Sequence, residues 1–415
     1  MVFHRHRPST LAVAALFCAF HNANASGFSV PEISVAGLGT GNAVVANPAM
    51  LGAVPYNPSL AAFHEGTTLT GGLTLVHADA QATAAAPNTM TSTNFQGKDN
   101  VFIPNLSLTH RINDNLTLAF NTSVPFGLST TYPVGFFDSI PPLLGGPAAS
   151  PTKSQVEVVD LSPSLAFKLA DNTSVAFGID YYRVRKVAFD TGSLQNKGDG
   201  DGWGWNISAS HINGPWSLGA SFRSHVAADI SGSTTVTGVG TFGGTSTTLD
   251  LPWRAQIGAR YAVNEKLALE ADISRTGWGS FDVLNISHSS PFPLNPITSA
   301  NHWKDANAYR LGGTYQLGGD TELRLGYTFD KTSMPDAFYS ARIADSDRHL
   351  FSIGMQRQLG DGLAIEAGYM LVRFKEVNFN SATAQTTPDA NGTSSYNAKY
   401  KTTVQLFGVG LSKRF

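Results

Sequence analysis

The chain of 415 residues has a single cysteine, Cys18, and only 14% charged residues. Because Cys18 lies in an apolar run near the N terminus, the rest of the chain can form no disulfide, thiolate nucleophile or zinc–thiolate site. The formal net charge of −2 argues against a nucleic-acid partner. Beyond residue 25 there is no apolar run of ~18 residues, which excludes a helical membrane protein.

The first 25 residues have the features of a secretory signal peptide. Arg5 and Arg7 precede the apolar run Leu11–Phe20, and Ala23-Asn24-Ala25 follows it. A basic start, a short apolar run and a small-x-small site together are typical of a signal peptide. The run is too short for a membrane-spanning helix, which needs ~20 residues. We therefore expect cleavage after Ala25, with Ser26 as the mature N terminus.

Polar and apolar residues alternate through segment after segment of the remaining chain. In Thr321–Asp330 (TELRLGYTFD), the apolar residues are Leu323, Leu325, Tyr327 and Phe329. Similar patterns occur in Val175–Tyr182, Ser217–Val226, Pro252–Val263, Asn307–Leu317, Leu350–Leu359 and Leu363–Phe374. Successive side chains of a strand point to opposite faces, so each segment predicts a strand with one apolar and one polar face.

Short turns and long connections separate these segments. The short turns include Asp171-Asn172, Asn213-Gly214 and Gly360-Asp361-Gly362, and the long connections are Thr131–Thr152, Ser231–Thr247, Asn285–Ala300 and Asn380–Tyr396. Alternating segments of ~10 residues with unequal connections are typical of an outer-membrane barrel. We predict an all-β fold, an antiparallel transmembrane barrel of about fourteen strands over residues 67–415. A soluble β-sandwich fits less well, since its strands are typically ~5–6 residues long.

Charged residues within the predicted strands lie opposite the apolar face. They are Arg223, Arg254, Arg260, Arg310, Arg324, Glu270, Asp272, Glu322 and Glu366. A basic residue facing mid-membrane lipid costs ~2–4 kcal/mol, so we expect these side chains to point into the lumen. There they could form a bracing ion-pair network or contact a ligand. The five residues Trp203, Trp205, Trp253, Trp278 and Trp303 are expected in interfacial aromatic girdles, and the terminal strand ends on an aromatic residue, Phe415.

Several motifs resemble the FadL/TodX family of hydrophobic-compound transporters. At the expected mature N terminus, Ser26-Gly27-Phe28, Glu32 and Gly37-Leu38-Gly39 are similar to the start of that family. Asn57-Pro58-Ser59 resembles its Asn-Pro-Ala motif, with Ser59 in place of alanine, and its spacing from Gly39 favours it over Asn47-Pro48-Ala49. Arg342–Arg348 (RIADSDR) looks like the family's Arg-x-Pro-Asp-x-Asp-Arg, with Ala344 in place of proline. Pro125–Thr130 and Gly198–Asn206 extend the resemblance along the mature chain.

The resemblance implies that residues 26–66 form an N-terminal hatch that plugs the barrel. Gly37–Gly41 then belongs to a packed plug and not to a phosphate-binding loop, since no strand precedes it. The implied function is passive uptake of hydrophobic compounds, fatty acids or aromatic hydrocarbons, by a monomer surrounded by outer-membrane lipid and without a cofactor. Phe28, Val30 and Phe126 are the expected substrate contacts. A substrate carboxylate would favour a lumenal arginine, Arg310 or Arg324, as its partner.

Pro125-Phe126-Gly127 interrupts a predicted membrane strand. Proline removes a ladder hydrogen bond and marks an edge, a bulge or a gap. By analogy with the family, the gap is a lateral opening through which a ligand leaves toward the membrane. The residues before it, Leu116, Leu118, Phe120 and Val124, are expected to face lipid.

The connection after this strand carries an apolar cluster, Phe136, Phe137, Ile140, Leu143 and Leu144. A loop should be polar, so the cluster suggests an external landing site for the ligand. The alternative is a loop folded onto its neighbours or dipped in lipid.

Two other classes of function compete with the transporter. An open general porin would be obstructed by a plug of about forty residues. A barrel hydrolase would need a nucleophile and a base placed together, and neither His211 nor His225 has an evident Ser/Asp partner. Asp199-Gly200-Asp201-Gly202 resembles a calcium loop only superficially, because the glutamate at the twelfth position is missing, and no metal site is expected.

Overall fold

The computed structural model describes residues 27–85, 93–137, 150–291, 295–380 and 396–415. The expected signal peptide, residues 1–25, lies outside the described residues. Within these ranges, no helix combines the length and the apolar character needed to cross a membrane.

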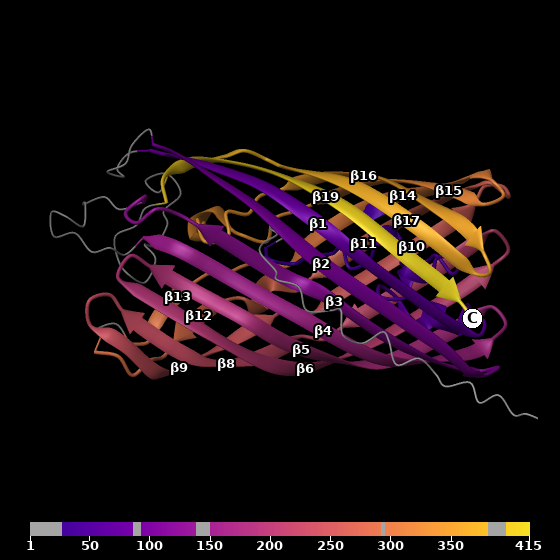
Figure 1. Cartoon of the computed structure of the whole chain (residues 1–415), viewed down its shortest axis with the longest axis horizontal. Coiled ribbons are helices and arrows are strands. Elements are labelled where there is room, and N and C mark those ends of the chain that lie inside the picture. Colours follow the sequence, from indigo (N-terminus) through magenta and orange to yellow (C-terminus); the bar gives the residue numbers. More distant parts are fainter. Residues whose placement is uncertain (1–26, 86–92, 138–149, 292–294, 381–395) are drawn as a thin grey trace, which may run out of the picture.

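Most of the chain forms one antiparallel sheet that closes on itself. Its strands are β1 (Thr67–Ala84), β2 (Asn94–Asn113), β3 (Leu116–Thr131), β4 (Pro151–Ala170), β5 (Thr173–Thr191), β6 (Leu194–Asn213), β7 (Trp216–Arg223), β8 (Val226–Val236), β9 (Gly240–Leu251), β10 (Arg254–Ala262), β11 (Leu267–Thr276), β14 (Ala306–Gly318), β15 (Thr321–Asp330), β16 (Arg348–Gly360), β17 (Leu363–Phe374), β18 (Val377–Phe379) and β19 (Ala398–Arg414). β1 pairs with β19 from Thr68↔Arg414 to Ala84↔Ala398, which closes the barrel (Figure 1).

The barrel wall has fourteen strands, as the sequence predicts. β7 and β8 count as one wall strand because both pair with β6. β9 and β10 also count as one, because β9 pairs with β8 and β10 pairs with β7. β18 extends β17 along β19. The expectation of an irregular connection over Ser231–Thr247 is wrong, because most of it belongs to the long β8–β9 hairpin. Within Asn285–Ala300, β12 (Val283–Ile286) and β13 (Ile297–Ala300) form a separate small sheet.

Alternation along the strands separates a lipid face from a lumen face. On β15, Leu325 is 62% exposed on the outside whereas its neighbour Arg324 is 1% exposed. On β14, Leu311 is 61% exposed and Arg310 is 5% exposed. The prediction that the strand charges point into the lumen is therefore confirmed at these positions.

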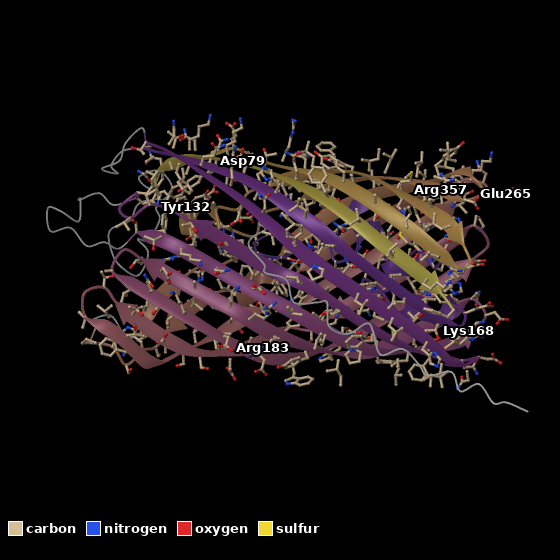
Figure 2. The ribbon with its side chains drawn as sticks, viewed as in Figure 1. Asp79, Tyr132, Lys168, Arg183, Glu265 and Arg357 are labelled. Atoms are coloured by element: carbon tan, nitrogen blue, oxygen red, sulfur yellow. The ribbon has the colours of Figure 1, made fainter. Side chains whose placement is uncertain are left out.

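The two ends of the barrel differ. Short turns join β2 to β3, β4 to β5 and β14 to β15 at the end where the chain finishes (Figure 1). Lys168, Glu265 and Arg357, which lie in or near short turns, are at this end (Figure 2). Outer-membrane barrels have short periplasmic turns and longer extracellular loops, so this end corresponds to the periplasmic side.

The N-terminal segment, residues 27–66, runs inside the barrel and is almost entirely buried. It contains α1 (Val35–Gly39), capped by the Ser34 hydroxyl, and two 3₁₀ turns, η1 (Leu51–Ala53) and η2 (Pro58–Phe63). α1 contacts β1 and β15, β16, β17 and β19, whereas η2 contacts β3, β4, β5 and β6. The segment therefore touches the inner wall on opposite sides of the lumen.

Glycine permits the closest of these approaches. A Cβ on Gly326 of β15 would lie 2.0 Å from the backbone carbon of Thr40, and one on Gly219 of β7 would lie 2.0 Å from the carbonyl oxygen of Val45. Real Cβ atoms do not approach backbone so closely, so a larger residue at either position would push the N-terminal segment away from the wall.

Candidate functional site

An aromatic cluster lies inside the barrel around Phe28. The Phe28 ring centroid is 4.6 Å from that of Trp278, 5.4 Å from Phe281, 6.0 Å from Phe126 and 6.1 Å from Trp303. Trp278 belongs to the 3₁₀ turn η4 (Trp278–Ser280) after β11, and Trp303 lies before β14. The cluster thus joins the N-terminal segment, β3 and the β11–β14 connection, and all five rings are buried.

Phe126 enters this cluster because β3 is irregular. The register of β3 against β4 shifts between Ser123 and Phe126, around Pro125. Before the shift Leu118 is exposed on the outside, whereas Val124 within it and Phe126 and Leu128 after it are all buried. The expectation that Val124 faces lipid is therefore wrong, because the irregularity reverses the phase of the strand.

The same irregularity ends the pairing between β2 and β3. The two strands are in register only between Asn113↔Leu116 and Leu106↔Thr122. Beyond that point the free edge of β3 pairs with the N-terminal segment instead: Val30 N donates to Pro125 O (2.8 Å), and Gly127 N donates to Phe28 O (2.9 Å). Phe28 and Val30, two of the expected substrate contacts, therefore lie next to the third, Phe126, within Pro125-Phe126-Gly127.

The C-terminal part of β3 and the residue after it are hydrogen-bonded to the connection between β15 and β16. Thr130 Oγ1 donates to Arg342 O (2.6 Å), and the Tyr132 hydroxyl donates to Ala341 O (3.1 Å). A cavity of about 270 Å³ occupies the space between β2 and this part of β3. Gln96 and Lys98 of β2, Ser129 and Thr130 of β3, and Tyr400 of β19 line it.

An apolar cavity of about 60 Å³ borders the aromatic cluster. Phe28, Leu128, Phe189, Leu249 and Phe281 line it, together with Arg342. The Arg342 guanidinium carbon stacks 3.5 Å from the Phe189 ring centroid, and Nη1 donates to Ser154 Oγ and Asp190 O, both at 3.1 Å. This cavity therefore combines apolar walls with one basic group.

A second cavity of about 70 Å³ lies inside the barrel, with Tyr56 and Asp330 among its lining residues. Arg223, Arg254 and Arg310 line it. Arg223 is ion-paired with Asp160 (3.2 Å) and Asp180. Arg254 donates to the Tyr182 hydroxyl (2.9 Å) and lies 5.1 Å from the Phe126 ring centroid. Within the described residues, neither Arg254 nor Arg310 forms an ion pair, and the Nε atom of each is buried without a hydrogen-bond partner.

Arg324 lies deeper in the barrel and is fully engaged. Its guanidinium pairs with Glu322 (2.8 Å) and Glu366 (2.6 Å) and donates to Gln356. It lines none of the three cavities described above. This arrangement matches the bracing network that the sequence left open as one alternative, and it leaves Arg324 no evident donor for a ligand.

Two acidic side chains of β11 anchor the N-terminal segment to the wall. Asp272 Oδ2 accepts from Val44 N (3.0 Å) and Val45 N (3.1 Å), and Glu270 Oε1 accepts from Ala46 N (2.7 Å).

Asn57-Pro58-Ser59 begins η2 and forms a second anchor. The Asn57 side chain caps the turn, and its Nδ2 donates to Val45 O (2.7 Å) and Ser210 Oγ of β6 (2.9 Å). Ser59 Oγ also lies 2.7 Å from Ser210 Oγ. The motif therefore ties the N-terminal segment to itself and to the barrel wall, at a distance from the aromatic cluster.

The Arg342–Arg348 motif lies above the cluster. Asp345 Oδ2 accepts from Gly27 N (3.0 Å) and Thr332 Oγ1 (2.7 Å). Burial raises the pKa of Asp345 above its ordinary value, while the Arg348 charge and these two hydrogen bonds oppose the rise. Ala344 has φ of +47°, a conformation that proline cannot adopt, so the proline of the family motif is incompatible with the backbone of this chain at position 344.

The chain matches the model of a known protein family over residues 16–415, nearly its whole length. The family is described as outer membrane protein transport protein (OMPP1/FadL/TodX). The chain belongs to this family.

Individual relatives support the same placement. The chain is 24% identical to a long-chain fatty acid transport protein of Escherichia coli O6:H1, with 98% of each chain covered. It is 23% identical to outer membrane protein P1 of Haemophilus influenzae, covering 98% of this chain and 99% of the relative.

Solved structures share the fold. A Pseudomonas aeruginosa FadL homologue superposes with a TM-score of 0.77 at 19% identity, covering 94% of this chain and 100% of the other. The toluene transporter TodX of Pseudomonas putida superposes with a TM-score of 0.70 at 16% identity, covering 92% and 98%. Members of this family are outer-membrane transport proteins and not enzymes, and the protein is assigned to the bacterial outer membrane on this basis.

Two of the five tryptophans expected in the girdles belong to the site instead. Trp203 is 66% exposed on the outside of the barrel, whereas Trp278 is fully buried in the aromatic cluster with Trp303. The sequence analysis also did not identify Phe281, which packs on Phe28, or Tyr182, which packs on Phe126. The available signal was the Gly277-Trp278-Gly279 break, which takes Trp278 out of the strand alternation.

The expected landing site on the external loop is not supported at its first two residues. Phe136 and Phe137 are fully buried and pack against each other at 4.8 Å, with Tyr132 beside both. The alternative, a loop folded onto its neighbours, therefore holds at these positions. Ile140, Leu143 and Leu144 lie outside the described residues.

Phe28→Ala should loosen the bonds between the N-terminal segment and β3. Each aromatic pair contributes ~0.5–1.5 kcal/mol beyond its area burial, and the substitution removes four such pairs. Since about 1.4 kcal/mol corresponds to a factor of ten, we expect amide hydrogen exchange at Val30 and Gly127 to accelerate at least roughly tenfold. Phe136→Ala, equally buried but without contact with Phe28, should leave both rates unchanged. Equal exchange in both variants would contradict the role of Phe28.

Proposed function

We propose that this protein takes up hydrophobic compounds passively across the outer membrane. The observation that carries the proposal is the apolar cavity beside Phe28, enclosed by aromatic and aliphatic residues. Ligand sites are concave, mostly apolar and equipped with a few polar groups, as this one is with Arg342. Relatives named for transport of long-chain fatty acids and of toluene suggest the two candidate substrate classes.

The basic groups around the cluster favour a substrate with a carboxylate. Arg254 and Arg310 are buried or half-buried and lack an ion-pair partner among the described residues. A charge-assisted hydrogen bond to a carboxylate would satisfy such a guanidinium. Arg310 thus remains a proposed contact, joined by Arg254, whereas the donors of Arg324 are already in use. An aromatic hydrocarbon would need only the apolar walls.

Tryptophan fluorescence can test both classes. We expect oleate, and toluene if hydrocarbons bind, to change the emission of the purified protein, and Trp278→Phe to remove most of that change. Trp216→Phe, on the exposed outer wall, is the matched control and should keep it. Arg254→Gln should weaken oleate binding roughly tenfold, since a hydrogen bond to a charged group is worth ~1.5–3 kcal/mol, and should spare toluene. If neither ligand changes the emission of the unmodified protein, the proposed site is wrong.

We also propose that residues 26–66 act as a hatch and that residues 1–25 are removed as a signal peptide. The contacts of α1 and η2 with opposite walls, and the bonds to Asp272 and Glu270, support a plugging role. Such a plug argues against the alternative of a general porin. N-terminal sequencing of the mature protein would test the cleavage after Ala25.

Gly326→Val should displace the hatch from the wall and raise ion conductance. Its side chain would collide with the Thr40 and Gly41 backbone, and overpacking of this kind typically costs ~1–3 kcal/mol. Gly313→Val is the matched control, because its Cβ would meet the flexible Leu269 side chain at 3.4 Å and the Ala268 carbonyl oxygen at 3.7 Å, both ordinary contact distances. Conductance is measured in planar bilayers. A folded barrel that lacks residues 27–63 and conducts no better than the full protein would exclude a plugging role.

Ligand release is proposed to occur laterally, between β2 and β3. The end of their pairing at Leu106↔Thr122 and the cavity of about 270 Å³ above it support this route. Unpaired backbone is costly in hydrocarbon, so such a break is tolerated only beside a cavity or a substitute partner, and Phe28–Val30 provides the partner for β3.

A thiol cross-link can close the proposed exit, because Cys18 is the only native cysteine and lies in the expected signal peptide. We expect cells with a cross-linked Gln96→Cys/Ser129→Cys pair to lose uptake of labelled oleate, and to regain it on reduction. Leu108→Cys/Phe120→Cys, a register pair where β2 and β3 are bonded, is the control and should not affect uptake. Undiminished uptake through the cross-linked protein would eliminate the lateral route.

A further inference from the structure

A group of basic side chains lies on the outside of the barrel, on the wall made by β17, β19, β1 and β2. The cationic patch comprises Lys98, Arg373, Lys375, Lys399 and Lys401, all of them exposed. Two carboxylates, Asp79 and Glu376, lie among these five bases, so the patch carries a net charge of +3. The whole chain, in contrast, has a net charge of −2. Positive charge is therefore concentrated on this wall.

Strand register brings the patch together. Arg373 of β17 is paired with Thr403 of β19, Thr403 with Asp79 of β1, and Asp79 with Lys98 of β2. Lys401 lies two residues beyond Thr403 on the same outward face. With strands ~4.8 Å apart and a rise of ~3.4 Å per residue, Lys98 and Lys401 are roughly 12 Å apart along the wall. The patch thus spans a surface comparable to one lipid headgroup with more than one anionic group.

Only part of this charge is neutralised. Glu376 is shared between Lys399 (3.0 Å) and Lys401 (3.6 Å), whose side chains remain 58% exposed. Asp79 accepts from the Gln96 amide (3.2 Å) and lies 3.4 Å from the Gln81 amide. Lys98, Arg373 and Lys375 form no ion pair with any described residue. The uncompensated charges leave room for external anions.

The height of the patch matches the lipid headgroups. Along β19, β1 and β2, the outward row Phe407–Leu75–Phe102 is apolar and aromatic, with Tyr369 packed on Phe407 at 4.9 Å. Such a row is typical of the aromatic girdle at the edge of the hydrocarbon. The basic residues follow beyond it, toward the end with the long connections, and Asp79 marks this region on the outline of the barrel (Figure 2). They therefore lie at the level of the outer-leaflet headgroups.

The opposite wall carries charges of both signs at the same end. Asp199 and Asp201 of β6 and Asp229 of β8 are exposed there, but so are Lys186 of β5 and Lys197 of β6, and Arg183 is ion-paired with the two β6 carboxylates. Arg183 and Asp79 lie on opposite sides of the view in Figure 2. These three acidic and three basic side chains sum to zero, whereas the cationic patch has a net charge of +3, so the patch distinguishes one side of the barrel from the other.

We infer that the cationic patch binds the phosphate groups of lipids in the outer leaflet of the outer membrane. Each basic side chain near an anionic lipid surface strengthens binding, and several adjacent ones act together. Lys98 also lines the cavity between β2 and β3. A phosphorylated lipid held by the patch would therefore lie beside that gap. The inference rests on the outer face alone and does not depend on the transported substrate.

The test measures binding of lipid A by native mass spectrometry of the full-length protein in detergent. The unmodified protein should retain bisphosphorylated lipid A and lose it as ionic strength rises, because salt screens exposed charges. Lys98→Gln/Arg373→Gln/Lys401→Gln should weaken this binding roughly ten- to hundredfold. Dephosphorylated lipid A should bind the unmodified protein and this variant equally.

The matched control removes three basic residues from the periplasmic end, as Lys168→Gln/Lys266→Gln/Arg357→Gln, and should bind lipid A like the unmodified protein. Should the patch variant fail to fold, as judged by heat-modifiable gel mobility, Lys98→Gln alone replaces it, since this side chain is exposed and unpaired. Equal loss in patch and control variants would overturn the inference. So would equally tight binding of the dephosphorylated lipid, or displacement of lipid A by an equal concentration of inorganic phosphate.

Discussion

The rest of the structure depends on one requirement: inside a bilayer, every backbone N–H and C=O must find a hydrogen-bond partner. Fourteen strands meet it by closing β1 on β19. Among the described residues, β3 meets it differently after Thr122, where it separates from β2 and bonds to Phe28–Val30 instead. The partner of that free edge is thus the N-terminal segment, which runs inside the barrel, so a displacement of this segment would also leave the edge of β3 unpaired.

Charge inside the barrel supports this arrangement. Asp272 and Glu270 hold the backbone of residues 44–46, and Arg324 bridges Glu322 and Glu366 beneath α1. Buried charges are stable only when paired and hydrogen-bonded, so these networks constrain where the N-terminal segment can lie. Nearer the aromatic cluster the balance changes, since Arg254 and Arg310 lack carboxylate partners among the described residues. These two arginines are the proposed partners of a substrate carboxylate.

Most of the fold could be predicted from local pattern, and most of the site could not. Alternation along Thr321–Asp330 identified both the strand and its lumen face, which the contrast of Leu325 with Arg324 confirms. It failed at Val124, because a register shift beside Pro125 reverses the phase. It also failed for Trp278, which follows a strand end and turns inward. Phe136 and Phe137 were expected in an external landing site, but their partners Tyr132 and Phe95 bury them.

The sequence by itself determined the architecture: a closed barrel with apolar residues outside and charges inside. It did so because the two-residue period of a strand and the cost of charge in lipid act locally, residue by residue. Only the tertiary structure decided which rings surround Phe28, which arginines remain unpaired and where β2 and β3 separate. These features join residues far apart in the chain, such as Gly27 with Asp345 and Val30 with Pro125. Their contacts depend on how the whole barrel closes around the N-terminal segment, and no local pattern records that closure.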